Sequence, residues 1–155
     1  LCAIDSENAG TYKANCERYL SQLDALDDEY EEVIENSKYK TLIFADRFPF
    51  RYLTDDYDLS YYAAFKGCSA ETEASFETIT FLANKADELN LPRILTIDGS
   101  DGKIAKTVAE TSKNKDRMIY SLDSLQSVTD NEFQSGKTYI KAMESNLEIL
   151  KKALN

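Results

Sequence analysis

Histidine is absent from the 155 residues, and this absence limits the possible chemistry more than any other feature of the composition. Histidine is the usual general base near neutral pH and the commonest protein ligand of transition metals. A serine or cysteine nucleophile lacks its usual partner in this chain, and the G-x-x-x-x-G-K pattern of phosphate-binding loops does not occur. Conventional enzyme classes are therefore weakly supported, and a metal site would have to use oxygen or cysteine ligands.

Cysteine is scarce, and the three residues present show no metal-binding spacing. Cys2, Cys16 and Cys68 form no C-x-x-C motif, and an odd number cannot pair completely within one chain. A zinc knuckle is therefore not expected. We expect Cys16, on an apolar helical face, to be a small core residue, and Cys68, in a Gly-Cys-Ser turn, to be exposed.

Basic residues are also fewer than acidic ones. The chain has 28 acidic and 18 basic residues, for a net charge of -10. This balance argues against a nucleic-acid partner, because neutralising phosphates requires clustered Lys and Arg. An acidic chain attracts cations, although the same charge also serves solubility.

Apolar runs are too short to cross a bilayer, and the first residues lack the basic region of a signal peptide. Residues 1–4 are typical of the last apolar turn of a longer structure, so we expect the chain to be a segment or a processed product. Its length, with 43% apolar and 30% charged residues, predicts one folded domain with a substantial core.

Short apolar segments alternate with helical patterns along the chain. After a long amphipathic helix that starts near residues 5–8 and ends near Asn36, we expect strands at 41–45, 59–65, 93–97 and 117–122, and helices at 48–57, 76–89, 103–111 and 139–154. Residues 128–136 are polar and are expected to form a loop. The alternation predicts an α/β fold, with a four-stranded parallel sheet covered by helices on both faces in a Rossmann-like lobe.

Three of these strands end on an acid: Asp46, Asp98 and Asp123. The carboxyl ends of parallel strands lie at one edge of the sheet, where ligands bind in open α/β folds, so these acids are candidates for a common site. Asp46 has a plainer alternative, which is to cap a helix beginning near Phe48. For the neighbouring aromatic cluster we expect Phe48 to pack in the core. Arg51 has two possible roles, neutralising Asp46 or binding an anion.

The loop after the third strand superficially matches one enzyme motif and one metal-binding motif. In Thr96–Gly102, the second acid of a phosphatase-type D-x-D loop is replaced by Ser100, and Asp101 comes one residue too late. The acids of this loop also lack the spacing of a calcium-binding loop. A magnesium-dependent phosphatase-like enzyme is therefore a minor alternative.

Several features in order resemble the C-terminal lobe of the zinc/manganese ABC-transporter substrate-binding proteins, the adhesin-lipoprotein group. They are the segments at 5–15, 23–27, 44–53, 71–75, 120–125 and 139–154. The resemblance covers nearly the whole chain. It implies two α/β lobes joined by a long rigid helix, with residues 1–37 as that linking helix and 38–155 as the C-terminal lobe.

In this family the metal lies in the cleft between the lobes. The resemblance implies that histidines of the first lobe and two residues of the second lobe bind it. The family's L-D-x-L aspartate matches Asp123. Its strand-end histidine matches Asp46 or, one residue earlier, Ala45, and we favour Asp46 because a carboxylate can bind a metal. Oxygen ligands alone suit manganese or calcium better than zinc, unless the other lobe supplies imidazoles.

The resemblance implies a non-enzymatic substrate-binding protein of a metal-ion importer, with a divalent ion, zinc or manganese, as cargo and an ABC permease in the membrane as partner. The protein would be an extracellular membrane-anchored lipoprotein, or periplasmic. Because first-lobe ligands are absent, we expect this chain alone to bind metal poorly. The lack of histidine leaves an alternative, an adhesion or interaction domain that has lost metal binding.

Overall fold

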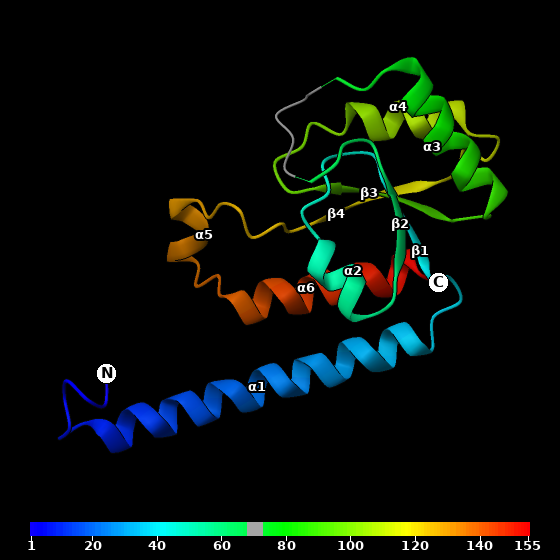
Figure 1. Ribbon diagram of the computed structural model, residues 1–155. Helices are drawn as coiled ribbons and strands as arrows, with labels where there is room; N and C mark the ends of the chain where they lie inside the picture. Colours follow the sequence, from blue (N-terminus) through cyan, green and yellow to red (C-terminus); the bar gives the residue numbers. More distant parts are fainter. Residues whose placement is uncertain (68–72) are drawn as a thin grey trace.

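The computed structural model describes residues 1–67 and 73–155 and contains an α/β lobe with a long N-terminal helix (Figure 1). The helices are α1 (Ala9–Glu35), α2 (Arg51–Asp56), α3 (Phe76–Glu88), α4 (Lys103–Thr111), α5 (Asp130–Gln134) and α6 (Tyr139–Ala153), and the strands are β1 (Thr41–Phe44), β2 (Ser60–Ala63), β3 (Arg93–Ile97) and β4 (Met118–Leu122). The expectation for Cys68 falls outside the described residues.

The four strands form one parallel sheet in the order β2-β1-β3-β4. β1 and β3 are central, which agrees with their nearly continuous apolar sequences. The predicted fold class, a four-stranded parallel sheet with helices on both faces, is confirmed.

The central strands carry alternate side chains into two separate cores. Leu42 and Phe44 of β1 point to the face covered by α1 and α6, whereas Ile43 and Ala45 pack under α3 and α4. Figure 1 shows these two helical layers on opposite sides of the sheet. Both faces of β1 are therefore buried, and the residue that follows it emerges from a fixed backbone.

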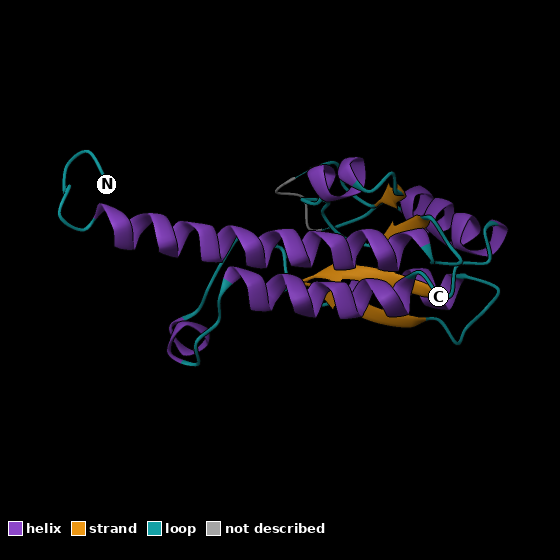
Figure 2. Ribbon diagram, turned by 90° about the horizontal axis from the view of Figure 1, so that it is seen from below, coloured by secondary structure: helices purple, strands orange, loops and turns teal. Residues whose placement is uncertain are grey.

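Helix α1 extends beyond the part of the lobe that it packs against. Its 27 residues span about 40 Å at 1.5 Å per residue, but its buried residues are only Leu26, Tyr30 and Ile34. The N-terminal part projects beyond the sheet (Figures 1 and 2). The expectation that Cys16 is a core residue is wrong, because this part of the helix has no lobe to pack against and the thiol is exposed.

Two other expectations differ from the structure. Helix α2 begins at Arg51 rather than Phe48, since Phe48 is instead drawn into the core at 2% exposure. The segment predicted as a loop contains α5, which a capping box between Thr129 and Glu132 starts. The other helices and strands lie within a few residues of their expected positions.

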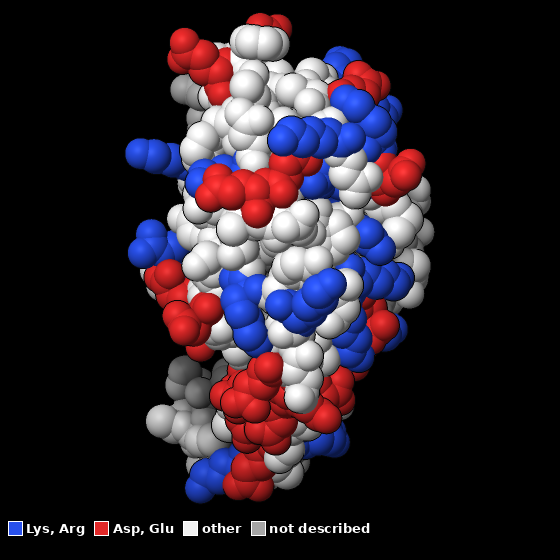
Figure 3. Space-filling model, turned by 90° about the vertical axis from the view of Figure 1, so that its right-hand side faces the viewer, with Lys and Arg blue, Asp and Glu red and all other residues white. Residues whose placement is uncertain are grey.

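The face at the amino ends of the strands carries charges of both signs. In Figure 3, Lys and Arg side chains are interspersed with Asp and Glu, and acidic side chains gather at its lower end. Such mixing is typical of a solvated surface. Within residues 1–67 and 73–155, no helix is long and apolar enough to cross a membrane.

Candidate metal centre at the carboxyl edge of the sheet

The parallel sheet places the three predicted acids at the same edge. Asp98 and Asp123 follow β3 and β4 directly, and Asp46 lies two residues beyond β1. The register fixes this alignment, because Phe44 pairs with Leu95 in β3 and Leu95 with Tyr120 in β4. The edge is the usual ligand-binding edge of an open α/β sheet.

Asp46 is a buried carboxylate with one unpaired oxygen. The residue is 7% exposed. Its Oδ1 accepts a hydrogen bond from the backbone N–H of Arg47 at 2.8 Å, and the Arg47 Nε lies 3.8 Å away. Its Oδ2 has no hydrogen-bond partner among the described residues. A buried carboxylate oxygen without a partner is costly, and such an atom calls for a partner such as a cation.

The contacts around Asp46 rule out the alternative that it caps the helix that follows. Phe50 is the N-cap of α2, with no side-chain hydrogen bond, so Asp46 does not cap that helix. Phe48 packs as expected, with its ring stacked on Tyr61 at a centroid distance of 3.5 Å. Arg51 pairs with Asp55, donating from Nε to both oxygens at 2.9 and 2.7 Å. The cation beside Asp46 is Arg47 rather than Arg51.

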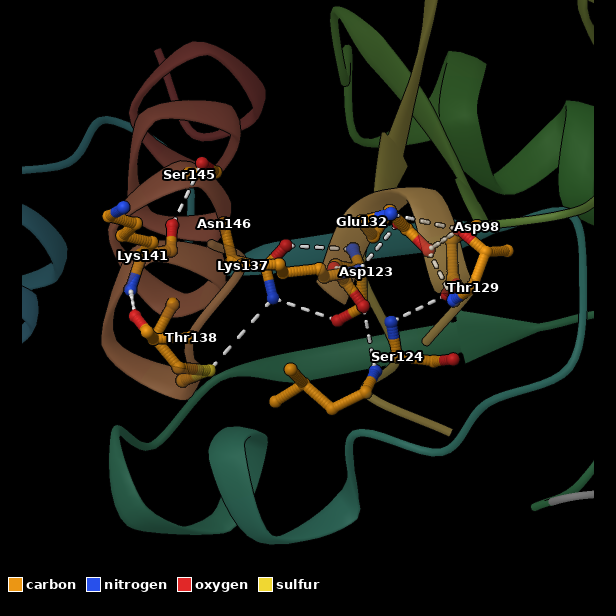
Figure 4. Close-up of polar contacts among 12 residues, drawn as sticks. Asp98, Asp123, Ser124, Thr129, Glu132, Lys137, Thr138, Lys141, Ser145 and Asn146 are labelled. Atoms are coloured by element: carbon orange, nitrogen blue, oxygen red, sulfur yellow. Dashed lines mark hydrogen bonds and ion pairs between the residues drawn. The ribbon is translucent and has the colours of Figure 1, made fainter. Parts of the chain in front are cut away.

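Asp123 is held in a polar network on the other side of β3 (Figure 4). Its backbone N–H donates to Asn146 Oδ1 at 2.8 Å, and Asn146 Nδ2 donates to its carbonyl oxygen at 2.9 Å. Asn146, on α6, is 2% exposed, so this pair of hydrogen bonds fixes the backbone at the strand end. The Asp123 Oδ1 accepts from the N–H of Leu125 at 2.9 Å.

The second oxygen of Asp123 is paired with Lys137, on the connection from α5 to α6. The Lys137 Nζ lies 2.5 Å from Asp123 Oδ2 and 2.9 Å from Glu132 Oε1. The two carboxylates raise the pKa of Lys137 above its ordinary range, Asp123 having the larger effect. The Lys137 ammonium and hydrogen bonds from Thr129 lower the pKa of Glu132 to about 2. Both groups therefore stay charged at neutral pH.

Asp46 and Asp123 are on strands separated by β3. Neighbouring strands lie about 4.8 Å apart, which puts the two strand ends roughly 10 Å apart across the edge. Residues 1–67 and 73–155 contain no group of three or more His, Cys, Asp or Glu that could hold a metal ion. The two carboxylates fit a divalent cation by chemistry, but they supply an incomplete coordination shell.

Asp98 and Asp101 have structural partners instead. Asp98 Oδ1 accepts from the backbone N–H of Ser124 at 2.6 Å, which ties the loop after β4 to β3. Asp101 precedes Gly102, the N-cap of α4, and accepts from the N–H of Lys103 at 3.0 Å while pairing with the Lys103 ammonium at 2.7 Å. Both carboxylates therefore accept from backbone N–H groups in the loops after the strands.

Three residues of the Asp123 network were not predicted from the sequence: Glu132, Lys137 and Asn146. The T-x-x-E spacing of Thr129 and Glu132 is a helix-start signal that could have revealed α5 and its acid. Lys137 and Asn146 have no comparable signal, because their contacts with Asp123 exist only after α5 and α6 fold back onto the sheet.

The fold defines a class of protein: an open α/β lobe with acidic side chains at the carboxyl edge of a parallel sheet, the edge at which such folds bind ligands. The comparison with protein families is more specific. The chain belongs to the family described as zinc-uptake complex component A, periplasmic (ZnuA), whose model matches residues 1–153. The predicted family is therefore confirmed, and it is a family of metal-binding solute-binding proteins rather than enzymes.

Individual relatives share a little over a quarter of their residues with this chain in the aligned region. A zinc-binding protein AdcA of Streptococcus pyogenes is 28% identical over 145 residues, which are 94% of this chain and 27% of that protein. The high-affinity zinc uptake system protein ZnuA of Bacillus subtilis is 28% identical over 150 residues, 97% of this chain and 46% of that protein. The chain therefore spans less than half the length of these relatives.

A solved structure confirms the fold over almost the whole chain. The metal-dependent lipoprotein YcdH of Bacillus subtilis superposes with a TM-score of 0.82 at 27% identity, covering 99% of this chain and 56% of that one. YcdH is named a lipoprotein, and the family is described as a periplasmic component of zinc uptake.

Proposed function

We propose that this chain is the C-terminal lobe of a zinc-uptake substrate-binding protein and that Asp46 and Asp123 supply ligands to an ion held between two lobes. The observation that carries this proposal is the buried Asp46 Oδ2, which lacks a partner among the described residues at the ligand-binding edge of the sheet. The zinc-binding names of the relatives favour zinc over manganese as cargo.

The long helix supports the two-lobe arrangement. Residues 1–37 would be the linking helix and 38–155 the lobe, and the N-terminal part of α1 exposes Tyr19 at 44% and Leu20 at 51%. Large apolar side chains exposed on a helix favour a covered surface in the complete protein. That the chain spans 56% of the YcdH structure agrees with a second lobe of similar size.

The other lobe has to supply the softer ligands. Carboxylates alone suit manganese or calcium, whereas imidazoles favour zinc, so a zinc site here requires histidines from the first lobe. The proposed protein would deliver the ion to an ABC permease from a membrane-anchored or periplasmic position. The chain alone would bind zinc weakly, because its two carboxylates are an incomplete site.

Zinc affinity of the complete protein tests this proposal, measured by isothermal titration with a competing chelator. We expect Asp46→Asn and Asp123→Asn each to weaken zinc binding by about a hundredfold, since each variant removes one charged ligand. Asp101→Asn is the matched control, because Asp101 is an exposed acid on the same edge with 61% of its side chain accessible. It should leave the affinity unchanged.

The same titration separates the proposal from its alternative. If neither Asp46→Asn nor Asp123→Asn changes zinc affinity, the ligand assignment is wrong. If the complete protein binds no zinc at all, the chain is instead an adhesion or interaction domain that kept the fold and lost the metal.

A further inference from the structure

Asp123 already has a cation that belongs to the chain itself. The Lys137 ammonium lies 2.5 Å from Asp123 Oδ2, and the two side chains are only 16% and 18% exposed (Figure 4). The Asp123 Oδ1 is occupied by the N–H of Leu125. Both oxygens of Asp123 therefore have partners within the chain, and Oδ2 is the one that Lys137 holds.

We propose that Lys137 is an internal cation that competes with the transported metal ion for Asp123, and that Glu132 retains the ammonium when the metal takes its place. This inference rests on the proposed function, because it requires Asp123 to be a metal ligand. It goes further by assigning opposing roles to two residues outside the ligand set.

The geometry allows this exchange with little rearrangement. Lys137 Nζ is already 2.9 Å from Glu132 Oε1, so it can give up Asp123 and keep a carboxylate partner. Glu132 is anchored independently, because its Oε2 accepts from the N–H and the hydroxyl of Thr129 at 2.8 and 2.7 Å. The flexible four-carbon stem of lysine is suited to such a move.

The carboxylate of Asp123 should stay in place while the lysine leaves. Asn146 holds the backbone of Asp123 through both its N–H and its carbonyl oxygen. Only the ammonium has to move, and the like charge of an arriving divalent ion repels it. The consequence is a lowered metal affinity, which makes release easier.

The test is zinc affinity and zinc dissociation rate in the complete protein, measured by competition with a chromophoric chelator. Lys137→Met keeps most of the side-chain length and removes the charge, and we expect it to tighten zinc binding about tenfold, or about 1.4 kcal/mol. Lys137→Gln serves as a second uncharged variant. Lys137→Arg retains the charge and should leave the affinity near that of the unmodified protein.

Two further variants make the result specific. Lys141→Met is the matched control, because Lys141 Nζ donates to the carbonyl oxygen of Gly136 and forms no ion pair with an acid in residues 1–67 or 73–155. It should have no effect. Glu132→Gln keeps the hydrogen bonding of a capping box but removes the charge that retains Lys137. It should weaken zinc binding about threefold.

Unchanged or weakened zinc binding in both Lys137→Met and Lys137→Gln would overturn the inference, since a lysine that merely orients Asp123 would give that result. The Asp123→Asn variant separates a failure of this inference from a failure of the proposed ligand role of Asp123. If it weakens binding while the uncharged Lys137 variants fail to strengthen it, only the inference is wrong. If it has no effect, the proposed ligand role of Asp123 fails as well.

Discussion

Asp46 combines burial with an unpaired oxygen, which is a combination that folding alone does not favour. Its Oδ2 is buried without a partner among the described residues, and its nearest cation, Arg47 Nε, lies 3.8 Å from the other oxygen. Residues at binding sites often lower the stability of the unliganded protein in this way. A purely structural aspartate would instead be expected to have its oxygens paired.

This contrast leads to a prediction about stability without metal. Asp46→Asn should raise the free energy of unfolding of the metal-free chain by about 1 kcal/mol, because a neutral amide costs less to bury than a carboxylate. Urea denaturation followed by circular dichroism measures the change. The exposed pair of Arg51 and Asp55 provides a control, since Asp55→Asn should change stability by less than about 0.5 kcal/mol. A loss of stability in Asp46→Asn would mean that the carboxylate has a structural role.

Individual residues were predictable where strand ends determine them. Apolar segments precede Asp46, Asp98 and Asp123, and this pattern predicts that the three acids lie at one edge of the sheet. Their different partners were not predictable, because Ser124, Lys137 and Asn146 reach them through long-range contacts. The error for Cys16 has a related cause, since helical periodicity indicates which face is apolar but not whether a lobe covers it.

At the scale of single elements, α5 depends on one charged residue. Glu132 closes the capping box with Thr129 and pairs with Lys137, and these contacts lower its pKa to about 2. This helix has only a weak sequence signal, because five residues of mostly polar composition between two loops have no hydrophobic periodicity. The longer helices α3, α4 and α6 were predictable because each has an apolar face that packs on the sheet.

The lowered pKa predicts the pH dependence of α5. Because the folded value lies below the ordinary value of 4.5, the stabilisation by Glu132 is complete above about pH 4.5 and is lost as the pH falls towards 2. Carboxyl chemical shifts in NMR spectra should give a midpoint near 2 for Glu132. In Lys137→Met the midpoint should rise towards 4.5, since the ammonium has the largest lowering effect. A midpoint that stays near 2 in this variant would contradict the assigned ion pair.

At the scale of the whole molecule, α1 extends beyond the part of the lobe on which it packs (Figure 1). The helix is packed through Leu26, Tyr30 and Ile34, and Tyr30 also donates from its hydroxyl to the carbonyl oxygen of Met143 at 2.7 Å. The preceding turns extend beyond the sheet (Figure 2). Sequence periodicity predicted the helix and its length. The family resemblance predicts that this helix links two lobes.

Hydrogen exchange can test whether a second lobe covers those turns. In the 155-residue chain, backbone amides of residues 12–22 should exchange close to the rate of an isolated helix, because a helix without tertiary packing is only marginally stable in water. In the complete two-lobe protein the same amides should be protected about a hundredfold more strongly. Amides of residues 27–34 serve as the internal control and should be protected in both proteins, since their segment packs on α6. Equal exchange of residues 12–22 in the two proteins would show that the first lobe does not contact this part of α1, and the proposed role of residues 1–37 as a linking helix would then be wrong.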